Sequence, residues 1–444
     1  MKKLTLFTVI LITFSCQKDH QLQEQIADYD NQKDFLNQVY QQSFNQNRIQ
    51  PNPISKTNSK PIYVHYMVWY KNLLENGKWG QHWTMTNKNP DVFLKDGRRE
   101  IASHFYPLIG PYSSTDKDLH EYHLLLMKLA GIDGIIFDWY GARDNNDFIE
   151  IKENTETFIS SIEEVGLNFA IMYEDHVAEH AINERISASQ LAAAVYDINY
   201  IKNTYFTSKN YARKNNKEYL FLFGPHFITN PKDWDDILSQ TQINPELFTL
   251  WKAKDRIGQN ADGEFSWIDP LHLPNLEYYY NYTIENNIPI IGSVYPGFDD
   301  YMAEGGWNHL VNNQWVIPHN GIQTFKSTLN LSNNYNADFL QVHSWNNFEE
   351  GTMIEPTIEF GYTFLEELQS YSGVKATKEH LLLPEKLYHL RKRFKKHRII
   401  QRLLDVVYRD IITLRFKNAD KILRAIEKVY HVTEHIENQN SRPN

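Results

Sequence analysis

The spacing of hydrophobic residues changes character at Pro61. Beyond that residue, short apolar runs alternate with stretches whose apolar residues recur at helical spacing. The apolar runs with the length of buried strands are IYVHYMVWY (62–70), DGIIFDWY (133–140), LNFAIMYE (167–174), YLFLFG (219–224), LFTLWK (247–252), EFSWID (264–269), PIIGSVY (289–295) and DFLQVHSW (338–345). Continuous apolar strands separated by helices indicate a parallel sheet that is covered on both faces.

The stretches between these runs have helix signals. DLHEYHLLLMKLAG (118–131) precedes the second strand, and ETFISSIEEVG (156–166) precedes the third and ends at Gly166, a helix-stop residue. Repeated strand–helix units favour a closed (β/α)8 barrel over an open doubly wound sheet, and no glycine-rich phosphate loop follows the first strand. We therefore predict an α/β fold: a (β/α)8 TIM barrel over 61–370, followed by a helical C-terminal extension over 371–444.

The N-terminal residues have the pattern of an export signal. A positive MKK start precedes the apolar run LTLFTVILITF, and Ser15 stands before Cys16, the single cysteine of the chain. The pattern resembles a bacterial lipoprotein signal over 1–15, with Cys16 as the lipidated residue; a plain secretory signal is the alternative. We expect an exported protein with a membrane lipid anchor, at the cell surface or on the periplasm-facing outer membrane. Residues 16–60, rich in Gln, Asn, Lys and Ser, predict a tether with a short helix around 33–42.

Composition narrows the range of ligands. The formal net charge is −10, and its acidic residues are dispersed, which argues against a nucleic-acid partner. The basic stretch RKRFKKHR (391–398) fits the solvated face of a helix. The chain holds 10 Trp, 27 Tyr and 24 Phe, enough for both a ring-rich core and flat surfaces that hold sugar rings.

Polar and aromatic residues gather where the expected strands end. In such a barrel the C-terminal ends of all strands form one rim, where active sites lie. The residues at these ends are Trp69, Tyr70, Asp138, Trp139, Tyr140, Glu174, Asp175, His176, Tyr295, Trp345, Asn346, Glu349 and Glu350. Any single carboxylate among them also fits a helix cap or an ion pair, but together they come from at least three strands.

This combination of side chains suits glycoside hydrolysis. Rings cover the apolar faces of a sugar, and amides and carboxylates bind its hydroxyls. Cleavage requires two carboxyls, ~5–5.5 Å apart for retention and farther apart for inversion. One of them has to stay protonated near neutral pH, which a partly desolvated site with aromatic walls favours.

Several stretches resemble glycoside hydrolase family 99 and, more distantly, family 71. They are IYVHYMVWYKNLLENGKWGQHW (62–83), PIIGSVYPGFDD (289–300), WN (307–308) and SWNNFEEGTMIEPT (344–357), within a resemblance that covers roughly 61–368. The resemblance implies a (β/α)8 enzyme of the endo-α-mannosidase or α-mannanase type that needs no metal or cofactor.

The last strand carries the most specific part of this resemblance. The family pattern N-E-W-H-E-G-T-x-I-E places its Asn on Asn346, its second Glu on Glu350 and its last Glu on Glu355, and it implies that Glu350 is the general acid and later the base. Its first Glu, which deprotonates the 2-hydroxyl of the sugar in the family, falls on Asn347, and its His falls on Glu349. Either another carboxylate serves here, or the mechanism differs, or the protein binds glycan without cleaving it.

A second motif competes with this interpretation. His176-Val-Ala-Glu179-His180 matches the H-x-x-E-H pattern of zinc peptidases. It follows a strand directly, and no third ligand stands out downstream. We therefore expect His176 to contact a sugar hydroxyl or to orient Glu174, and we expect no metal site.

The sequence as a whole predicts an endo-acting glycoside hydrolase that cleaves an extracellular polysaccharide, with α-mannan as the default by resemblance. The catalytic candidates are Glu350, Glu349, Asp138 and Glu174. The candidates for binding a polysaccharide or oligosaccharide substrate are Trp69, Tyr70, Trp139, Tyr140, His176, Tyr295, Trp345, Asn346, Asn347 and Glu355. The alternatives are a non-catalytic glycan-binding lipoprotein and a zinc-dependent hydrolase.

Overall fold

The computed structural model describes residues 27–45, 50–307 and 315–440. These fall into two compact units, one within Pro53–Pro384 and a second one assembled from the described parts of Met1–Asn52 and Glu385–Asn444. The expected signal peptide at 1–15 and the expected lipidation at Cys16 lie outside the described residues.

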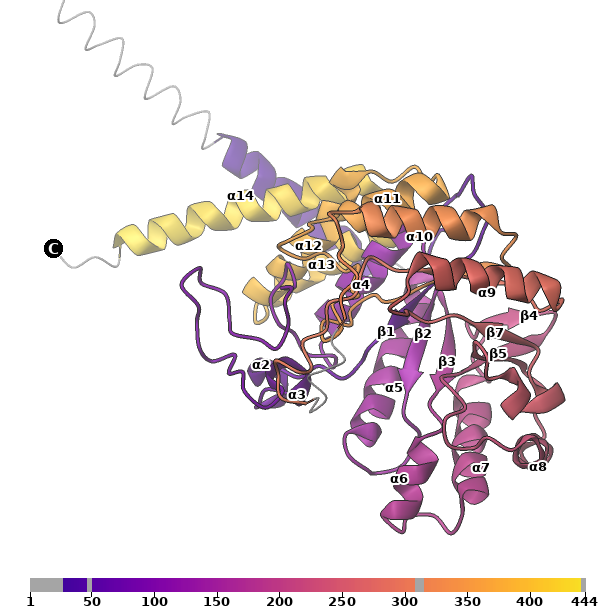
Figure 1. Ribbon diagram of the computed structural model, residues 1–444. Coiled ribbons are helices and arrows are strands. Elements are labelled where there is room, and N and C mark those ends of the chain that lie inside the picture. The colour runs from indigo at the N-terminus through magenta and orange to yellow at the C-terminus, as the bar shows by residue number, and fades with distance from the viewer. Residues whose placement is uncertain (1–26, 46–49, 308–314, 441–444) are drawn as a thin grey trace, which may run out of the picture. The chain divides into compact units, whose positions relative to one another are not determined.

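Pro53–Pro384 is built around one sheet of eight parallel strands (Figure 1). The strands are β1 (Ile62–Tyr66), β2 (Gly134–Trp139), β3 (Asn168–Tyr173), β5 (Lys217–Leu222), β6 (Glu246–Leu250), β7 (Gly263–Phe265), β8 (Ile291–Val294) and β9 (Phe339–Val342). Their order is β7-β6-β5-β3-β2-β1-β9-β8, so the first strand pairs with the last. Each lies within or beside a predicted apolar run, and the predicted fold class is confirmed. The two-residue strand β4 (Arg213–Lys214), antiparallel to β5, was too short to leave a periodic pattern.

Side chains connect the two ends of this sheet. The hydroxyl of Tyr279 lies 3.0 Å from the carbonyl oxygen of Glu264 in β7 and 3.2 Å from that of Ile291 in β8. Gln341 Nε2 in β9 donates to the carbonyl of Ser266, just past β7, over 2.9 Å. Among the described residues no backbone ladder joins β7 to β8, so the barrel is nearly closed, and these side chains link its edges.

Helices follow most of the strands. They are α2 (Leu73–Asn76), α3 (Gln81–Thr84), α4 (Lys117–Ala130), α5 (Phe148–Val165), α6 (Val177–Asn183), α7 (Gln190–Tyr200), η2 (Ile201–Tyr205), α8 (Pro231–Thr241), η3 (Lys254–Arg256), η4 (Gly258–Asn260), α9 (Leu273–Glu285), α10 (Gln323–Asn334) and α11 (Thr363–Ser372). α4 starts where Asp116 accepts the N–H of Asp118, as N-cap residues do. α5 ends at Gly166, the predicted stop, whose φ of 80° suits glycine.

A layer of polar side chains lies inside the barrel. The rings of His65 and His343 stack with centroids 4.8 Å apart, and both pack against Trp267. His65 Nε2 bonds Gln341 Oε1 at 3.1 Å, and His343 Nε2 bonds Ser293 Oγ at 2.9 Å. Burial lowers the pKa of His65 to about 4 and that of His343 well below its usual value, so both rings are neutral near pH 7.

The second unit is helical in its described part. Residues 27–42 form a helix that continues into η1 (Ser43–Asn45), and α13 (Arg398–Ile412) and α14 (Phe416–Asn440) complete the unit. The division between the units falls within α12 (Lys378–Arg393). Arg402 Nε donates to Ser43 Oγ over 2.7 Å, so the helix within the expected tether packs against α13. Arg391, in the basic stretch, is buried and pairs with Asp405 at 3.1 Å, unlike the solvated residue we expected.

The structure also bears on membrane insertion. Within the described residues, every helix is either too short or too polar to cross a bilayer.

Candidate active site

A cavity of about 270 Å³ opens at the C-terminal ends of the strands. Five carboxyl side chains, one histidine and several aromatic rings surround it. Its lining consists of Met67, Trp69, His82, Asp138, Tyr140, Asp147, Ile151, Met172, Glu174, Phe223, Trp267, Met302, Trp307, Asn347, Glu349 and Glu350. Carboxylates for acid–base chemistry thus share one space with rings that can cover a sugar.

The ends of β1 and β9 are fixed to each other by an amide side chain. Asn346 Oδ1 accepts the N–H of Met67 at 2.9 Å, and its Nδ2 donates to the carbonyl of the same residue at 2.9 Å. The hydroxyl of Tyr70 donates to the carbonyl of Asn346 at 2.8 Å and accepts the N–H of Phe348 at 3.1 Å. The first and last strands therefore present the turn 347–350 to the cavity in a defined position.

Asp138 and Glu174 form a proton-sharing pair on neighbouring strands. Burial, the charge of Glu174 and a hydrogen bond to it raise the pKa of Asp138 well above its usual value. Burial raises the pKa of Glu174 to about 7, although hydrogen bonds from Asp138 and Tyr140 act in the other direction. The hydroxyl of Tyr140 lies 3.0 Å from Asp138 Oδ2. Asp138 is therefore the protonated member, and it donates to Glu174.

Glu350 has the surroundings of a protonated carboxyl group. Burial, followed by the charges of Glu349, Asp138 and Asp300, raises its pKa to about 8. Its Oε2 atom is buried, and among the described residues it contacts no hydrogen-bond donor. Its backbone is fixed, because its carbonyl accepts the N–H of Asp299 at 2.8 Å. A neutral carboxyl that faces a cavity without a partner can donate its proton to a bound oxygen.

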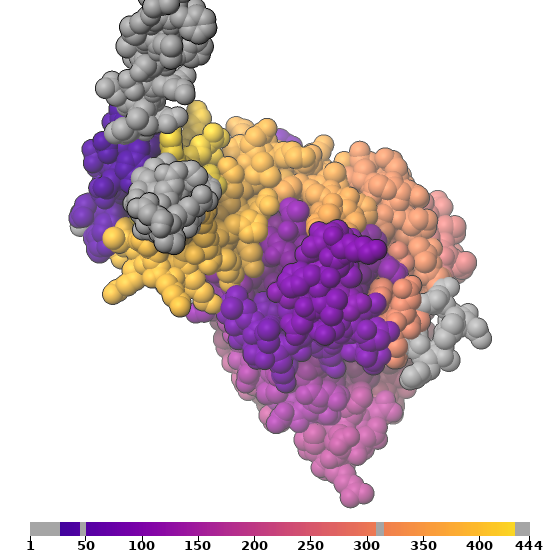
Figure 2. All heavy atoms as spheres, turned by 90° about the vertical axis from the view of Figure 1, so that its left-hand side faces the viewer, coloured from indigo at the N-terminus to yellow at the C-terminus, as the bar shows by residue number. Residues whose placement is uncertain are grey.

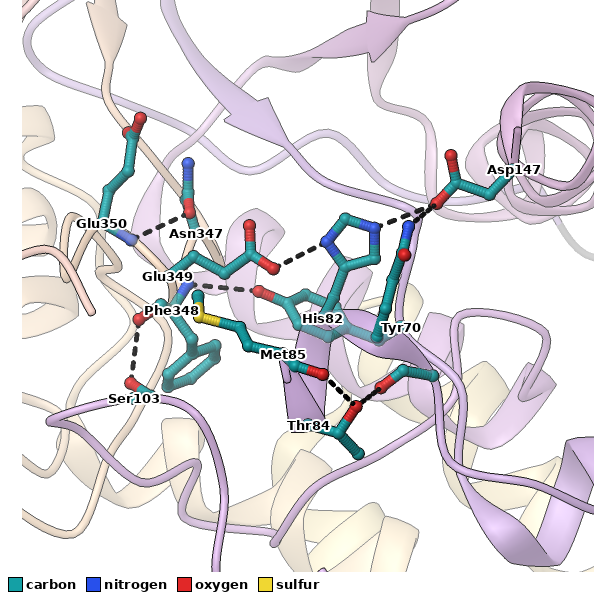
Figure 3. Close-up of polar contacts among 12 residues, drawn as sticks. Tyr70, His82, Thr84, Met85, Ser103, Asp147, Asn347, Phe348, Glu349 and Glu350 are labelled. Carbon is teal, nitrogen blue, oxygen red and sulfur yellow. Dashed lines mark hydrogen bonds and ion pairs between the residues drawn. The ribbon is translucent and has the colours of Figure 1, made fainter. Parts of the chain in front are cut away.

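The side chain of Glu349 points away from that of Glu350 and contacts the imidazole of His82 (Figure 3). Its Oε1 lies 2.6 Å from His82 Nδ1, and the opposite nitrogen of the ring, Nε2, lies 3.0 Å from Asp147 Oδ2. Burial by itself would lower the pKa of His82, but the charge of Glu349 and the bonds to both carboxylates raise it to about 9. Burial also opposes ionisation of Asp147, yet the bond from His82 leaves the pKa of Asp147 below its usual value. The three side chains therefore form a carboxylate–imidazolium–carboxylate array.

Two long connections fix this array in place. His82 belongs to α3, in the loop after β1, and Asp147 immediately precedes α5. The segment after β8 contributes Tyr301, whose N–H donates to the carbonyl of Glu349 at 2.7 Å. The loop after β1 also bonds this segment through Thr86 N and the Gly305 carbonyl, 3.0 Å apart, and its purple atoms border orange atoms at the surface in Figure 2.

The hydrogen bonds of Asn347 stabilise the turn 347–350. Its Oδ1 accepts the N–H of Glu350 at 3.2 Å, and its own N–H donates to Ser344 Oγ at 2.8 Å. The residue also lines the cavity. An amide at this position can bind a sugar hydroxyl, but it cannot accept a proton as a carboxylate does.

A second cavity of about 870 Å³ adjoins the first, since Trp69, His82, Asp147 and Trp307 line both. Its other walls include Trp79, Gln81, Phe148, His176 and His180. The two cavities together offer more room than one sugar needs, with rings along both parts.

The structure brings seven of the candidate residues to the first cavity. They are Glu350, Glu349, Asp138, Glu174, Trp69, Tyr140 and Asn347. His176 lines the adjoining cavity instead, and its Nδ1 lies 2.9 Å from Glu174 Oε2.

Six candidate residues lie behind the cavity wall. Tyr70 and Asn346 connect β1 with β9 through the hydrogen bonds given above. Trp139, on the opposite face of β2 from Asp138, stacks on Tyr200 at 6.1 Å. The others are Tyr295, which bonds His272; Trp345, which packs on His123; and Glu355, which accepts from Tyr112. These six support the site from within the core and do not line it.

Sequence reasoning missed several residues of the cavity wall. His82 and Asp147 lie in long connections, away from any strand end, and Trp267 and Phe223 were not among the residues singled out at the strand ends. The GQHW stretch of the first loop, which contains His82, belongs to a segment that resembles family 99, but no feature of it singled out His82. The same holds for Trp307, in the WN pair.

The H-x-x-E-H motif lies at the start of α6. The rings of His176 and His180 meet edge to face, with centroids 5.5 Å apart. Among the described residues, no three His, Cys, Asp or Glu side chains are arranged to hold a metal ion.

Comparison with known proteins finds similarity to glycosyl hydrolase family 99. Residues 57–244 match the model of glycosyl hydrolase family 99. This range contains His82, Asp138, Asp147 and Glu174, while Glu349 and Glu350 lie beyond it. A mouse glycoprotein endo-alpha-1,2-mannosidase-like protein is 23% identical over 330 residues, which cover 67% of this chain and 69% of the relative. The glycoprotein endo-alpha-1,2-mannosidase of Xenopus laevis is 23% identical over 329 residues, with 67% and 70% covered.

Solved structures share the fold. The GH99 endo-alpha-mannosidase from Bacteroides thetaiotaomicron superposes with a TM-score of 0.53 at 18% identity, covering 70% of this chain and 96% of the other. A glycoside hydrolase-like protein gives a TM-score of 0.52 at 14% identity, with 73% and 97% covered.

Proposed function

We propose that this chain acts as a member of glycoside hydrolase family 99 and cuts internal bonds of an extracellular, α-mannan-like polysaccharide, with Glu350 as the general acid. The observation that carries the proposal is the state of Glu350. It is a carboxyl group with a pKa of about 8 and an unpartnered buried oxygen, at a cavity walled by aromatic rings.

The surroundings of Glu350 suit proton donation to a glycosidic oxygen. At neutral pH the group is mostly protonated, and its proton is poised for transfer because the pKa lies close to the working pH. Trp69, Trp267 and Trp307 offer flat faces for the C–H surfaces of sugars. The carboxyls and Asn347 can bind the hydroxyls around the ring.

The adjoining cavity supports internal cleavage. A polymer needs binding space on both sides of the bond that breaks, and Trp69 and Trp307 line both cavities. Trp79 and Phe148 extend the aromatic lining beyond the carboxyl cluster.

The proposed location rests on the N-terminal sequence alone. A positive start, an apolar run and Cys16 after a small residue fit an exported lipoprotein anchored to a membrane. Such a protein would meet polysaccharide outside the cytoplasm, in agreement with the proposed substrate.

A second candidate function has one observation in its favour. Asn347 occupies the position at which the family pattern has its first Glu, and it cannot act as a base. A protein that only binds glycan would tolerate this change.

The test is oligosaccharide release from a panel of yeast, plant and algal polysaccharides, with Glu350→Gln as the matched variant. We expect internal cleavage of an α-mannan by the wild type, and loss of ~10²-fold or more in the variant, the usual contribution of a general acid. Glycan binding by the wild type without any product would favour the second candidate. Unchanged turnover in Glu350→Gln would reject the assignment of the acid.

A further inference from the structure

We propose that Glu349 is the carboxylate that accepts the proton of the attacking hydroxyl, and that His82 and Asp147 are positioning residues that hold it for this role. This inference rests on the proposed glycoside hydrolysis and names the second catalytic group of the same site. Sequence reasoning left three candidates open for that group, namely Glu349, Asp138 and Glu174.

The hydrogen-bond geometry distinguishes Glu349 from the other two. Its Oε1 lies 2.6 Å from His82 Nδ1, while His82 Nε2 lies 3.0 Å from Asp147 Oδ2. Asp147 also accepts from Gln81 Nε2 at 2.9 Å, which fixes the outer carboxylate. Because each ring nitrogen of His82 faces a carboxylate, the ring is doubly protonated and both carboxylates are ionised.

The array is rigid and reaches into the cavity. The ring of His82 stacks on Trp69, and it also meets Trp307 at an interplanar angle of 86° with centroids 5.4 Å apart. The Glu349 backbone is held by Tyr301, whose N–H donates to its carbonyl at 2.7 Å. Glu349 itself lines the cavity next to Glu350, so an acid and an ionised carboxylate occupy successive positions of one turn.

Asp138 and Glu174 are less suited to this role. They share a proton, and burial keeps the pKa of both above the usual range for carboxyls. Among the described residues no Lys or Arg forms an ion pair with Asp138, and the imidazole beside Glu174, that of His176, has a lowered pKa because it is itself half-buried. This pair can hydrogen-bond sugar hydroxyls, but it does not offer a stably ionised base.

Hydrolysis of the glycosidic bond by this route requires only Glu350, Glu349 and one water molecule. Glu350 gives its proton to the glycosidic oxygen as the bond from the anomeric carbon to that oxygen breaks. A hydroxyl, from water or from the sugar itself, attacks the anomeric carbon, and Glu349 takes its proton. Net addition of one water yields two sugar ends, and proton exchange with solvent restores both carboxyls.

Chemical rescue tests the role of Glu349. Glu349→Ala should lose ~10²–10⁴-fold in kcat on the substrate that the wild type cleaves. Sodium azide attacks the anomeric carbon without needing to lose a proton, and it should restore turnover at least about tenfold with a glycosyl azide as product. Asp138→Ala and Glu174→Ala, treated in the same way, should not be rescued. Rescue of either of them instead of Glu349→Ala would overturn the assignment.

The positioning role of His82 needs its own test, with His104 as a matched control. His104 also lies between two carboxylates, Asp299 at 3.1 Å and Glu304 at 3.2 Å, but outside the cavity. His82→Gln should lower kcat more than it changes KM, because the Glu349 carboxylate loses the ring that holds it in place. His104→Gln should leave both unchanged. An unchanged kcat in His82→Gln would overturn the positioning role.

A readout without turnover separates this inference from the proposed function. In 15N-histidine NMR spectra, the His82 signal, identified by its absence in His82→Gln, should be that of an imidazolium at pH 7.5. In Glu349→Gln it should become neutral at that pH. A neutral His82 in the wild type overturns the array even if the enzyme is active. An imidazolium in a protein that cleaves no glycan supports the array and rejects the proposed function and the catalytic role of Glu349.

Discussion

The imidazole of His82 lies flat on the indole of Trp69, with ring centroids 4.6 Å apart and planes inclined by 13°. Both rings line the cavity, and both come from the connection after β1. An imidazolium on the face of an indole gains cation–π attraction, which favours its protonated form. The stack therefore contributes to the charge of the array as well as to its orientation.

Removal of the indole should weaken the charge on His82. Trp69→Leu should lower the pKa of His82 from about 9 by ~0.4–1.4 units, because a cation–π contact is worth ~0.5–2 kcal/mol and one pKa unit corresponds to ~1.4 kcal/mol. NMR titration of His82 measures the shift. Trp79→Leu, which removes an indole that faces Arg99 instead, serves as the control and should leave the titration unchanged.

The rate should fall in alkali as Glu350 loses its proton. A general acid works only in its protonated form, and the pKa of Glu350 is raised to about 8, so kcat/KM should be maintained below that pH and decline above it. Initial rates from pH 5 to 10 give the profile. A kcat/KM that already falls steadily from pH 5 upward, as expected for a glutamate with the ordinary pKa of ~4.3, would contradict the assignment.

Substitutions at Asp138 should reveal which member of the pair carries the proton. Asn can donate to Glu174 as a protonated Asp does, so Asp138→Asn should keep the pKa of Glu174 near 7. Asp138→Ala removes the donor, so it should raise that pKa further and cost ~1–3 kcal/mol of stability. Carboxyl 13C NMR and denaturant unfolding measure the two effects. Equal behaviour of the two variants would show that Asp138 is not the donor.

The protein should lose stability in mild acid. His65, His120 and His319 each have a pKa lowered to about 4, chiefly by burial, against ~6.5 in the unfolded chain. The stability that these three neutral histidines contribute is fully present above pH 6.5. It is lost as the pH falls toward 4, because the histidines of the unfolded chain bind protons at a higher pH than those of the folded chain. Each group can contribute up to roughly 3 kcal/mol.

Urea unfolding at pH 7.5, 6 and 5 measures this loss. His82 acts in the opposite sense, since its raised pKa adds stability that is present below pH 6.5 and lost as the pH rises through about 9. Stability that stays constant between pH 7.5 and 5 would contradict the neutral state of the buried histidines.

The hydroxyl of Tyr279 should stabilise the barrel where its edges meet. Tyr279→Phe removes the group that lies between the carbonyls of Glu264 and Ile291, and it should cost ~1–3 kcal/mol. Hydrogen exchange should accelerate in β7 and β8 more than in β2 and β3. Tyr278→Phe, at a neighbouring exposed position, is the control and should change stability by less than ~0.5 kcal/mol.

Much of the fold was readable from local sequence. Runs such as DGIIFDWY and LNFAIMYE predicted β2 and β3, because a strand buried on both faces has to be apolar along its length. Gly166 marked the end of α5 through its left-handed backbone. The boundary between the two units within α12 could not be predicted in this way, because the helical spacing of apolar residues continues across it.

Within the site, strand ends placed Asp138, Glu174 and Glu350 at one rim, because all strands of a parallel barrel end on the same side. Trp139 does not line the cavity, since neighbouring residues of a strand point to opposite faces. Trp345 lies beyond the end of β9 and packs on His123 instead.

The sequence by itself determined the order of strands and helices, the barrel they form and the rim on which acidic side chains gather, because these follow from short-range periodicity. Only the tertiary structure decided the chemistry of those side chains. His82 and Glu349 are 267 residues apart, and their contact depends on two long connections that leave no periodic signal. Protonation was decided in the same way, since the pKa values of Glu350 and Asp138 depend on how deeply the folded chain buries them and on which charges it brings near.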